Sequence, residues 1–404
     1  MSLVGSGRVD PEKSRAILGF NGLRGLSVIL VYLNHKCGLQ FYSGSVGVWI
    51  FFILSGFLII GELNRQRSKV ETAASPSAAE IVTFWVKRAT RIFPAYYALL
   101  VILFLTRSYF QHAGPDLGFR YHFVYLSNYW IGSVIGGSAG PFGVLWTLSV
   151  EQQFYLIAPF LFILLPLERH FVACMCVVAL GLIGHFLMYS SGFNHTAIHT
   201  LSSWNFSLIA FGGAITILHL HRQGWAPNGN GTFACLLIVA FALCSNGVIY
   251  DAPAYLSPAI DVAIGLCLVA LVWWVRANQE SVFVQALEWE PLEHLGKISY
   301  GFYLVHNFVP NPLGKALTLY GGMSVPNSVK ITAGAAIGFV ISYAVAHVSW
   351  KYFESPILRS RRGLTKFFLQ YVPENPSPGV PRTESNRGSA PAQRLVRKAS
   401  SSDG

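Results

Sequence analysis

Charged residues are scarce in this sequence. Asp, Glu, Lys and Arg make up only 12% of the 404 residues, about half of the roughly 25% that is usual in soluble domains. Apolar residues make up 53%, which leaves too few polar side chains to cover a water-soluble surface. A single soluble core of this size would also exceed the usual limit of about 250–300 residues. The scarcity of charge therefore argues against a soluble protein and indicates one that lies in a lipid bilayer.

Cysteine is scarce as well. The cysteines mostly stand in apolar runs and lack the paired spacing of metal ligands. Such residues are typical of small hydrophobic packing positions. We therefore predict no metal site and no permanently bound cofactor. The six residues are Cys37, Cys174, Cys176, Cys235, Cys244 and Cys267.

Basic residues outnumber acidic ones, 29 to 18, and the formal net charge is +11. A basic chain can indicate nucleic-acid binding. Here, however, the Lys and Arg residues lie between the apolar runs and in the C-terminal segment, where such charges set the orientation of membrane helices. No nucleic-acid partner is therefore predicted.

Long apolar runs recur along nearly the whole chain. Each is about as long as a helix must be to cross a bilayer, roughly 20 residues. The pattern predicts an all-α polytopic membrane protein with about ten transmembrane helices. The predicted spans are residues 17–40, 44–63, 92–111, 145–167, 171–190, 202–220, 232–250, 258–276, 298–319 and 329–350.

Lys and Arg gather on alternate sides of these spans. They stand before the first span, between the second and third, and after the last, whereas residues 190–201 and 251–257 contain neither. Cytoplasmic segments are enriched in Lys and Arg, so we predict that both termini are cytoplasmic.

The sequence divides into three predicted parts. Residues 1–16 form a cytoplasmic N-terminal segment, residues 17–358 a membrane-embedded domain, and residues 359–404 a basic cytoplasmic tail. The tail is rich in Pro, Ser, Gly and Arg from about residue 370, a composition that is expected to be disordered. Within the membrane domain, residues 64–80 are polar and are predicted as a cytoplasmic connector.

Two ionisable residues of the first predicted span, Arg24 and His35, are candidates for function. Their separation returns them to nearly the same helix face, about 16 Å apart along the axis. Ionisable groups inside a bilayer are costly and indicate function. The predicted orientation places Arg24 near the cytoplasmic end and His35 in the outer half. Two simpler explanations remain open: Arg24 can extend to the membrane interface, and His35 can be a hydrogen-bonded packing residue.

Arg88 and Arg91 stand just before the third predicted span. Arginines three residues apart share a helix face and can clamp a phosphate or carboxylate. A positive charge that only anchors the span is the alternative.

Glu151 lies in an otherwise apolar helix, with no cation on its own turn. A buried carboxylate without a partner becomes protonated, so we predict that Glu151 pairs with a cation from another helix, either one of the arginines or His35. Trp146, Ser149 and Gln153 form a polar stripe on the same helix that is predicted to line a cavity. A water-facing Glu near the helix start is the alternative.

Several motifs then occur in order. They are Gly22 to Gly25 running to His35, Gly47 to Ile59, Arg88 to Tyr97, Trp146 to Tyr155, Ile298 to His306, and Trp350 to Pro356. With these motifs the sequence resembles acyltransferase family 3, the integral-membrane O-acyltransferases that include O-antigen acetylases and nodulation-factor acetyltransferases. The resemblance covers residues 16–358.

Three residues depart from the family pattern. Trp49 stands where many members have Asp, which removes a potential acidic partner of His35. Thr147 replaces the usual Ser, and Gln152 replaces a second Glu. The short segment after the last span also leads us to expect no additional extracytoplasmic esterase-like domain of the kind that some members carry.

The resemblance implies a multi-pass enzyme of the bacterial cytoplasmic (inner) membrane. It would transfer an acyl group, usually acetyl, from cytoplasmic acyl-coenzyme A (acyl-CoA) to a hydroxyl of a carbohydrate such as a lipopolysaccharide or exopolysaccharide. The expected partners are the lipid bilayer and a lipid-linked or exported glycan acceptor, with a homo-oligomer or a glycan-assembly machinery as a further partner. A proton-coupled transporter of a small solute, with intramembrane Arg, His and Glu as a relay, is the main alternative.

The same resemblance assigns roles to individual residues. Arg24, Arg88 and Arg91 would hold the phosphates of acyl-CoA. His35 and Glu151 are the candidate catalytic residues, with His35 either a general base or a covalent acyl carrier. The residues expected to line the site are Trp146, Ser149, Tyr155 and His306.

Overall fold

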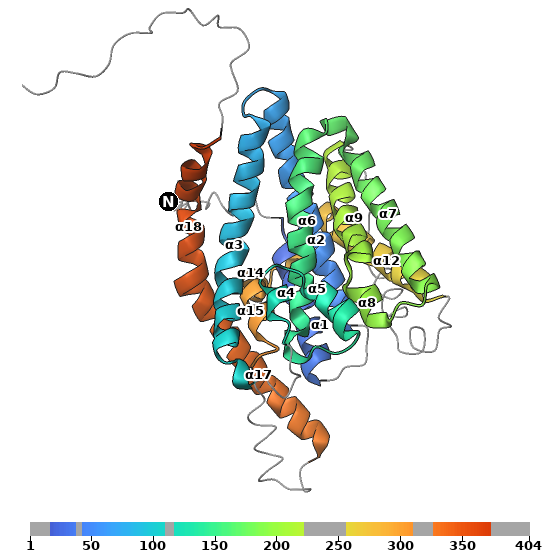
Figure 1. Cartoon of the computed structure of the whole chain (residues 1–404), viewed down its shortest axis with the longest axis vertical. Helices are drawn as coiled ribbons and strands as arrows, with labels where there is room; N and C mark the ends of the chain where they lie inside the picture. The colour runs from blue at the N-terminus through green and yellow to red at the C-terminus, as the bar shows by residue number, and fades with distance from the viewer. Residues whose placement is uncertain (1–16, 38–42, 110–116, 222–255, 310–325, 373–404) are drawn as a thin grey trace, which may run out of the picture. The chain divides into compact units, whose positions relative to one another are not determined.

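The computed structural model describes residues 17–37, 43–109, 117–221, 256–309 and 326–372 (Figure 1). All regular structure in these ranges is helical. The long helices are α1 (Phe20–Cys37), α2 (Ser43–Glu71), α3 (Ser77–Leu105), α6 (Leu145–Leu164), α7 (His170–Ser190), α9 (Ser202–His221), α12 (Ser257–Ala277), α17 (Asn327–Ser349) and α18 (Ser355–Leu369). The short elements are α4 (Phe119–His122), α5 (Ser127–Tyr129), η3 (Trp130–Ile135), η4 (Gly140–Val144), η5 (Leu167–Arg169), α8 (His195–Thr200), α13 (Val282–Leu287), α14 (Glu290–Lys297), α15 (Ser299–Val305) and η7 (Trp350–Glu354).

Seven helical stretches among the described residues are long and apolar enough to cross a membrane. They are Gly44–Glu71, Ser77–Leu105, Gly140–Leu164, Leu167–Ser190, His195–Leu220, Ser257–Ala277 and Asn327–Leu369. The all-α, membrane-spanning class is thus supported. The count of ten spans and the cytoplasmic placement of both termini stay predictions. The predicted span 232–250 and the end of the predicted span 298–319 lie outside the described residues.

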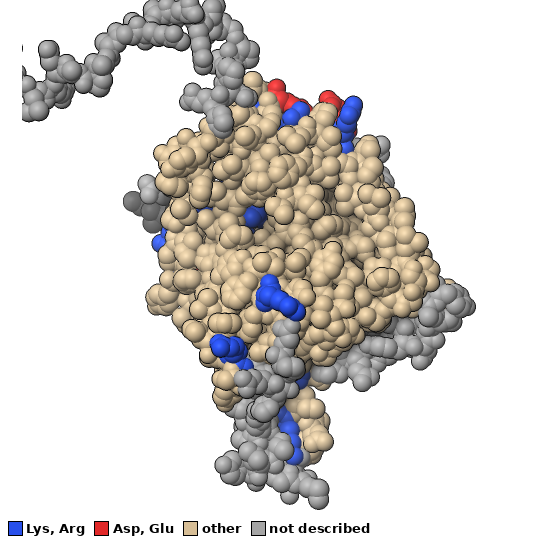
Figure 2. All heavy atoms as spheres, in the orientation of Figure 1, with Lys and Arg blue, Asp and Glu red and all other residues tan. Residues whose placement is uncertain are grey.

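The surface agrees with this class. In Figure 2 most of the described face is uncharged. Acidic residues appear along its upper edge together with basic ones, and further basic residues appear at its centre and in its lower part. Ion pairs at the α2–α3 hairpin account for charges of this kind: Arg67 and Glu71 lie 3.0 Å apart, and Lys69 and Glu80 lie 3.4 Å apart. A surface that is mostly uncharged, with its acidic residues confined to one edge, fits a helix bundle in lipid.

The predicted connector at residues 64–80 is largely helical, and its cytoplasmic position stays a prediction. Helix α2 continues to Glu71 and α3 begins at Ser77. Hydropathy marks only the apolar part of a helix, whereas ion pairs between neighbouring turns, such as Arg67 with Glu71, extend it into water. Because α3 starts earlier than predicted, Arg88 and Arg91 lie inside this helix rather than before it.

Helix α18 includes residues 359–369, the beginning of the predicted tail. It lies against α3 (Figure 1). Residues 373–404 lie outside the described residues.

Close contacts between small residues set the position of α2. It packs against α1, α6, α9 and α12 and is the most buried of the seven candidate spans. A Cβ atom at Gly56 would lie 1.7 Å from the carbonyl oxygen of Ile209, and one at Gly212 would lie 2.0 Å from that of Ile53. Only glycine lets the α2 and α9 backbones approach so closely, a common contact in membrane bundles.

Candidate active site

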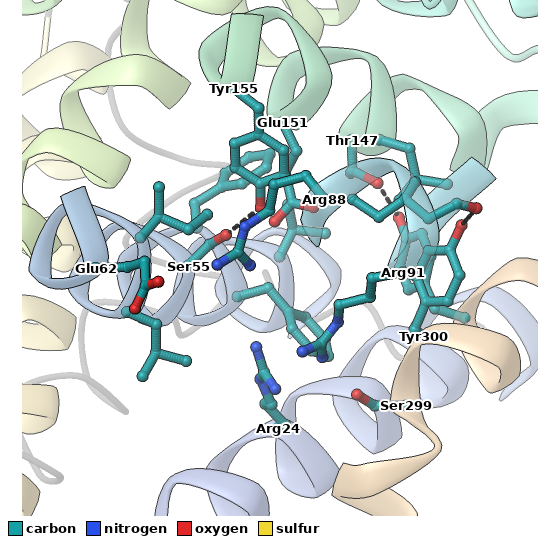
Figure 3. A pocket seen from close by; sticks show the side chains of 18 of the residues that line it. Arg24, Ser55, Glu62, Arg88, Arg91, Thr147, Glu151, Tyr155, Ser299 and Tyr300 are labelled. Carbon is teal, nitrogen blue, oxygen red and sulfur yellow. Dashed lines mark hydrogen bonds between the residues drawn. The ribbon is translucent and has the colours of Figure 1, made fainter. Parts of the chain in front are cut away.

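A cavity of about 310 Å³ lies between α1, α2, α3, α6 and α15 (Figure 3). This volume is within the range of small-molecule sites. Most of its wall is apolar or aromatic, and the polar groups come from all five helices. Its lining residues are Arg24, Val48, Phe51, Phe52, Ser55, Leu58, Ile59, Glu62, Arg65, Arg88, Arg91, Ile92, Thr147, Leu148, Glu151, Tyr155, Ser299, Tyr300 and Tyr303.

Three arginines from two helices converge on this cavity. Arg24 comes from α1, and Arg88 and Arg91 come from α3 (Figure 3). The two α3 arginines share a face because they are one helical turn apart. The three arginines that the sequence grouped thus line one cavity, and their role in binding a donor stays a prediction.

Arg88 is held by aromatic rings and keeps one donor unused. Its guanidinium carbon lies 5.4 Å from the ring centre of Phe84 and 5.9 Å from that of Tyr155, distances at which the cation is attracted by the ring faces. Its Nε is buried and donates to no group in the described part of the chain. A buried donor without an acceptor is rare in proteins, so this nitrogen is suited to bind an acceptor on a ligand.

The acidic residues of the cavity do not balance these arginines. Glu62 is already paired with Arg65 and Lys87. Among the described residues, no carboxylate lies within ion-pair distance of Arg24, Arg88 or Arg91. Three guanidinium groups therefore face one remaining carboxylate, that of Glu151. The excess of positive charge suits an anionic ligand such as a phosphate ester.

Glu151 shares the cavity with the arginines without contacting them. Its carboxylate lies beside the hydroxyl groups of Ser55 and Tyr155, whose oxygens are 2.6 Å apart (Figure 3). Arg24 and Arg91 act on it electrostatically over a longer distance. The predicted cations are therefore present, but a direct ion pair is not formed within the described residues.

His35 lies apart from this cavity, at the other end of α1. Its exposed ring is nearly parallel to the buried ring of His306, with the ring centres 5.3 Å apart, and its Nδ1 lies 2.9 Å from Nε2 of that residue. Nδ1 of His306 lies 2.7 Å from the carbonyl oxygen of Tyr303. Of the two kinds of cation predicted as partners of Glu151, His35 is thus not the partner, because it lies eleven residues from Arg24, about 16 Å along α1, as the sequence predicts.

Tyr303 contacts both the cavity and the histidine pair. Its side chain lines the cavity, and its hydroxyl accepts a hydrogen bond from Thr147 at 3.0 Å. Its backbone carbonyl accepts from His306. The histidine pair therefore lies immediately behind one wall residue of the cavity.

The hydrogen bonds fix which nitrogen atoms carry protons. A backbone carbonyl only accepts, so Nδ1 of His306 must donate to Tyr303. In the neutral ring Nε2 of His306 then accepts, and Nδ1 of His35 must donate to it. Nε2 of His35 is left with a lone pair. This is the tautomer that a histidine base or nucleophile requires.

The residues predicted to line the site divide into two groups. Tyr155 lines the cavity, and His306 contacts His35. Trp146 instead packs 5.9 Å from the ring of Phe52, and Ser149 is buried, with its oxygen accepting from the Ser127 amide. Neither lines the cavity.

The prediction that the polar stripe on α6 lines the cavity was therefore wrong. Gln153, its third member, hydrogen-bonds Ser202 at 2.6 Å and Asn128 at 2.9 Å, which joins α6 to α5 and α9. The cavity face is formed by Thr147, Glu151 and Tyr155, at spacings of four residues. The stripe is polar because it holds helices together.

Seven polar side chains of the cavity were not predicted as site residues: Ser55, Glu62, Arg65, Thr147, Ser299, Tyr300 and Tyr303. Ser55, Tyr300 and Tyr303 stand inside motifs of the sequence, and their polarity within apolar helices was the available signal. Glu62 and Arg65 stand at the polar end of a span, where charge is ordinary.

Comparison with known proteins finds relatives whose names describe O-acetyltransferases. The chain is 26% identical to the peptidoglycan O-acetyltransferase OatA of Listeria monocytogenes, over 91% of this chain and 60% of that protein. It is 22% identical to a putative O-acetyltransferase of Staphylococcus aureus, over 90% of this chain and 61% of that protein. It is 25% identical to the putative peptidoglycan O-acetyltransferase YrhL of Bacillus subtilis, over 73% of this chain and 49% of that protein.

The chain thus spans about three fifths or less of the length of these relatives. No solved structure matches it significantly. The sequence model of a family described as "acyltransferase domain" matches residues 17–347, nearly all of the predicted membrane-embedded domain. The stretch includes Arg24, His35, Arg88, Arg91 and Glu151, the residues that first suggested the resemblance. The chain belongs to acyltransferase family 3.

Proposed function

We propose that this chain is a membrane-embedded O-acetyltransferase that uses acetyl-CoA as donor and a carbohydrate hydroxyl of an exported glycan as acceptor. The observation that carries the proposal is the cavity in which Arg24, Arg88 and Arg91 face a single carboxylate, Glu151, that forms no ion pair among the described residues. In a family of acyltransferases, an anion-binding cavity of this size suits the donor better than a neutral sugar.

The donor offers what the cavity requires. The diphosphate of coenzyme A carries charge for the guanidinium groups, and its oxygens can accept from the unused Nε of Arg88. The thioester is separated from the diphosphate by the flexible pantetheine arm. A donor whose phosphates are held at Arg24 would therefore extend its thioester toward Tyr303 and the histidine pair.

The transfer needs a base, since a sugar hydroxyl is a weak nucleophile at neutral pH. In one mechanism Nε2 of His35 takes the hydroxyl proton while the hydroxyl oxygen attacks the thioester carbon. The carbon–sulfur bond then breaks, and the thiolate takes that proton to leave as coenzyme A. In the other mechanism Nε2 attacks the thioester carbon first, and the carbon–sulfur bond breaks to release the thiolate of coenzyme A. The sugar hydroxyl then attacks the acetyl carbon, the bond to Nε2 breaks, and the thiolate takes the hydroxyl proton. Both use the nitrogen that the His306 contact leaves free.

Two arguments support a glycan on the outer side of the membrane as the acceptor. The relatives named above include proteins called peptidoglycan O-acetyltransferases, which favours peptidoglycan or a similar glycan. The distribution of Lys and Arg favours a cytoplasmic position for the arginines, whereas His35 lies toward the opposite end of α1. A donor from the cytoplasm and an acceptor from the outer side could then meet near the histidine pair.

The test uses radiolabelled acetyl-CoA and the full-length protein in proteoliposomes with peptidoglycan fragments or other glycans as acceptor. We expect label in the glycan that mild base releases, because O-acetyl esters are base-labile. Arg88→Ala should reduce transfer at limiting donor, whereas the control Arg107→Ala, at an exposed position after α3, should not. No consumption of acetyl-CoA by folded protein with any glycan would overturn the proposal and favour a transporter.

A further inference from the structure

A second cavity of about 320 Å³ adjoins the first. It lies between α1, α2, α9 and α12, and it shares Arg24, Leu58 and Arg65 with the first cavity. Arg24 and Arg65 thus stand between the two spaces. A ligand that passes these arginines can occupy both cavities at once.

The second cavity has basic groups of its own. Arg276 stands in the last turn of α12 and His219 in the last turn of α9, and the two side chains act on each other electrostatically. Both are partly buried. No carboxylate is among the described residues that line this cavity, and none lies within ion-pair distance of Arg276.

Such an arrangement is unfavourable without an anion. Arg276 and Arg24 line the same space, and removal of a guanidinium from water without a paired carboxylate disfavours its charge. The polar groups nearby do not relieve this. Thr216 donates its hydroxyl to the carbonyl of Phe57, and the Asn21 amide donates to Glu293, which pairs with Lys297. The cavity therefore presents donors and positive charge together.

The rest of the lining is apolar and partly aromatic. Phe20 and Phe57 meet edge to face at 5.1 Å, and Ile17 and Leu220 complete the wall. A flat heteroaromatic base fits such a surface. The combined lining suits a ligand with an aromatic base and a phosphate that is separate from the phosphates held in the first cavity.

We infer that the second cavity binds the nucleotide end of acyl-CoA, with Arg276 and His219 on its 3′-phosphate and Arg24 beside its diphosphate. This inference rests on the proposed donor and adds a site to it. The adenine base lies between the apolar side chains, and the pantetheine arm runs past Arg24 into the first cavity. Arg276 is thus a residue that distinguishes coenzyme A from its 3′-dephospho form.

The experiment compares acetyl-CoA with 3′-dephospho-acetyl-CoA as donor. For the wild type we expect a KM roughly tenfold higher with the dephospho donor, as loss of a charged hydrogen bond predicts. Arg276→Ala should raise the KM for acetyl-CoA by a similar factor and leave the KM for the dephospho donor unchanged. Arg88→Ala should raise both. Arg169→Ala, in the exposed η5 turn, is the matched control and should change neither.

A binding measurement separates this inference from the proposed function. Adenosine 3′,5′-bisphosphate should bind the detergent-solubilised protein more tightly than AMP, and Arg276→Ala should remove the difference. If both binding results are obtained but acetyl transfer fails, the nucleotide site is supported and the proposed donor role is wrong. If transfer works but Arg276→Ala affects both donors equally, or the two nucleotides bind alike, the nucleotide site is wrong.

Discussion

Replacement of His306 by Phe tests how the histidine pair works. Phe keeps a flat ring of similar size between Phe302 and Tyr303, but it removes the Nε2 that accepts from His35. When His35 takes a proton, its Nδ1–H becomes part of a cation, and a hydrogen bond from a charged group contributes about 1.5–3 kcal/mol. At about 1.36 kcal/mol for each factor of ten, the loss of that bond should lower kcat roughly 10- to 160-fold.

The assay is steady-state acetyl transfer with saturating glycan and varied acetyl-CoA. The KM for acetyl-CoA should change less than about twofold, because the phosphates are proposed to bind at Arg24, Arg88 and Arg91 rather than at His306. This division between kcat and KM distinguishes a positioning role from general unfolding.

A matched control exists elsewhere in the chain. His294 and His347 also lie 3.0 Å apart, Nε2 to Nδ1, on α14 and α17, and neither lines the first cavity. His294→Phe should leave kcat within about twofold of the wild type. If His306→Phe keeps the wild-type kcat while His35→Gln is inactive, the tautomer argument is refuted and His35 acts without its partner.

Three further predictions concern the arginines, Glu151 and the helix packing. Arg88→Lys and Arg91→Lys keep the charge but lose the planar fork, so each should raise the KM for acetyl-CoA roughly tenfold; wild-type KM values in both would reduce these residues to topology anchors. Glu151→Gln removes the carboxylate that faces three arginines. It should destabilise the protein in detergent by about 1–3 kcal/mol, less than the 3–5 kcal/mol of a contacting buried pair. His35→Gln should abolish transfer with an unchanged thermal midpoint, and equal midpoints for the two variants would instead place Glu151 in the chemistry. Gly56→Leu should reduce the amount of folded protein severely, since even a Cβ would lie 1.7 Å from the Ile209 carbonyl oxygen; a normal melting profile in fluorescence-detected size exclusion would show that α2 and α9 are not packed this way.

The sequence by itself determined the membrane class and much of the candidate site. Apolar runs long enough to cross a bilayer are a property of composition, so they are visible without a structure. The helices α7, α9, α12 and α17 lie within a few residues of their predicted bounds. Arg24 was identified because a charge inside an apolar segment is costly, and Arg88 and Arg91 because arginines three residues apart share a helix face.

Only the tertiary structure decided which residues face one another. The sequence grouped His35 with Arg24 by helix periodicity, yet the partner of His35 is His306, which α15 brings beside α1 from a distant part of the chain. The cavity face of α6 was misjudged for a similar reason. Polarity alone cannot tell a stripe that binds a ligand from one that, like Gln153, binds neighbouring helices.

The second cavity shows this most clearly. Arg276 and His219 end two separate spans, where a basic residue is ordinary in any membrane protein. They meet near Arg24 because glycine contacts such as that of Gly56 with Ile209 let α2 approach α9 closely and so fix how these helices are rotated. The local sequence sets where a helix begins and which residues lie on each of its faces. The rotation of the helix and the helices that it packs against depend on contacts between residues far apart in the chain.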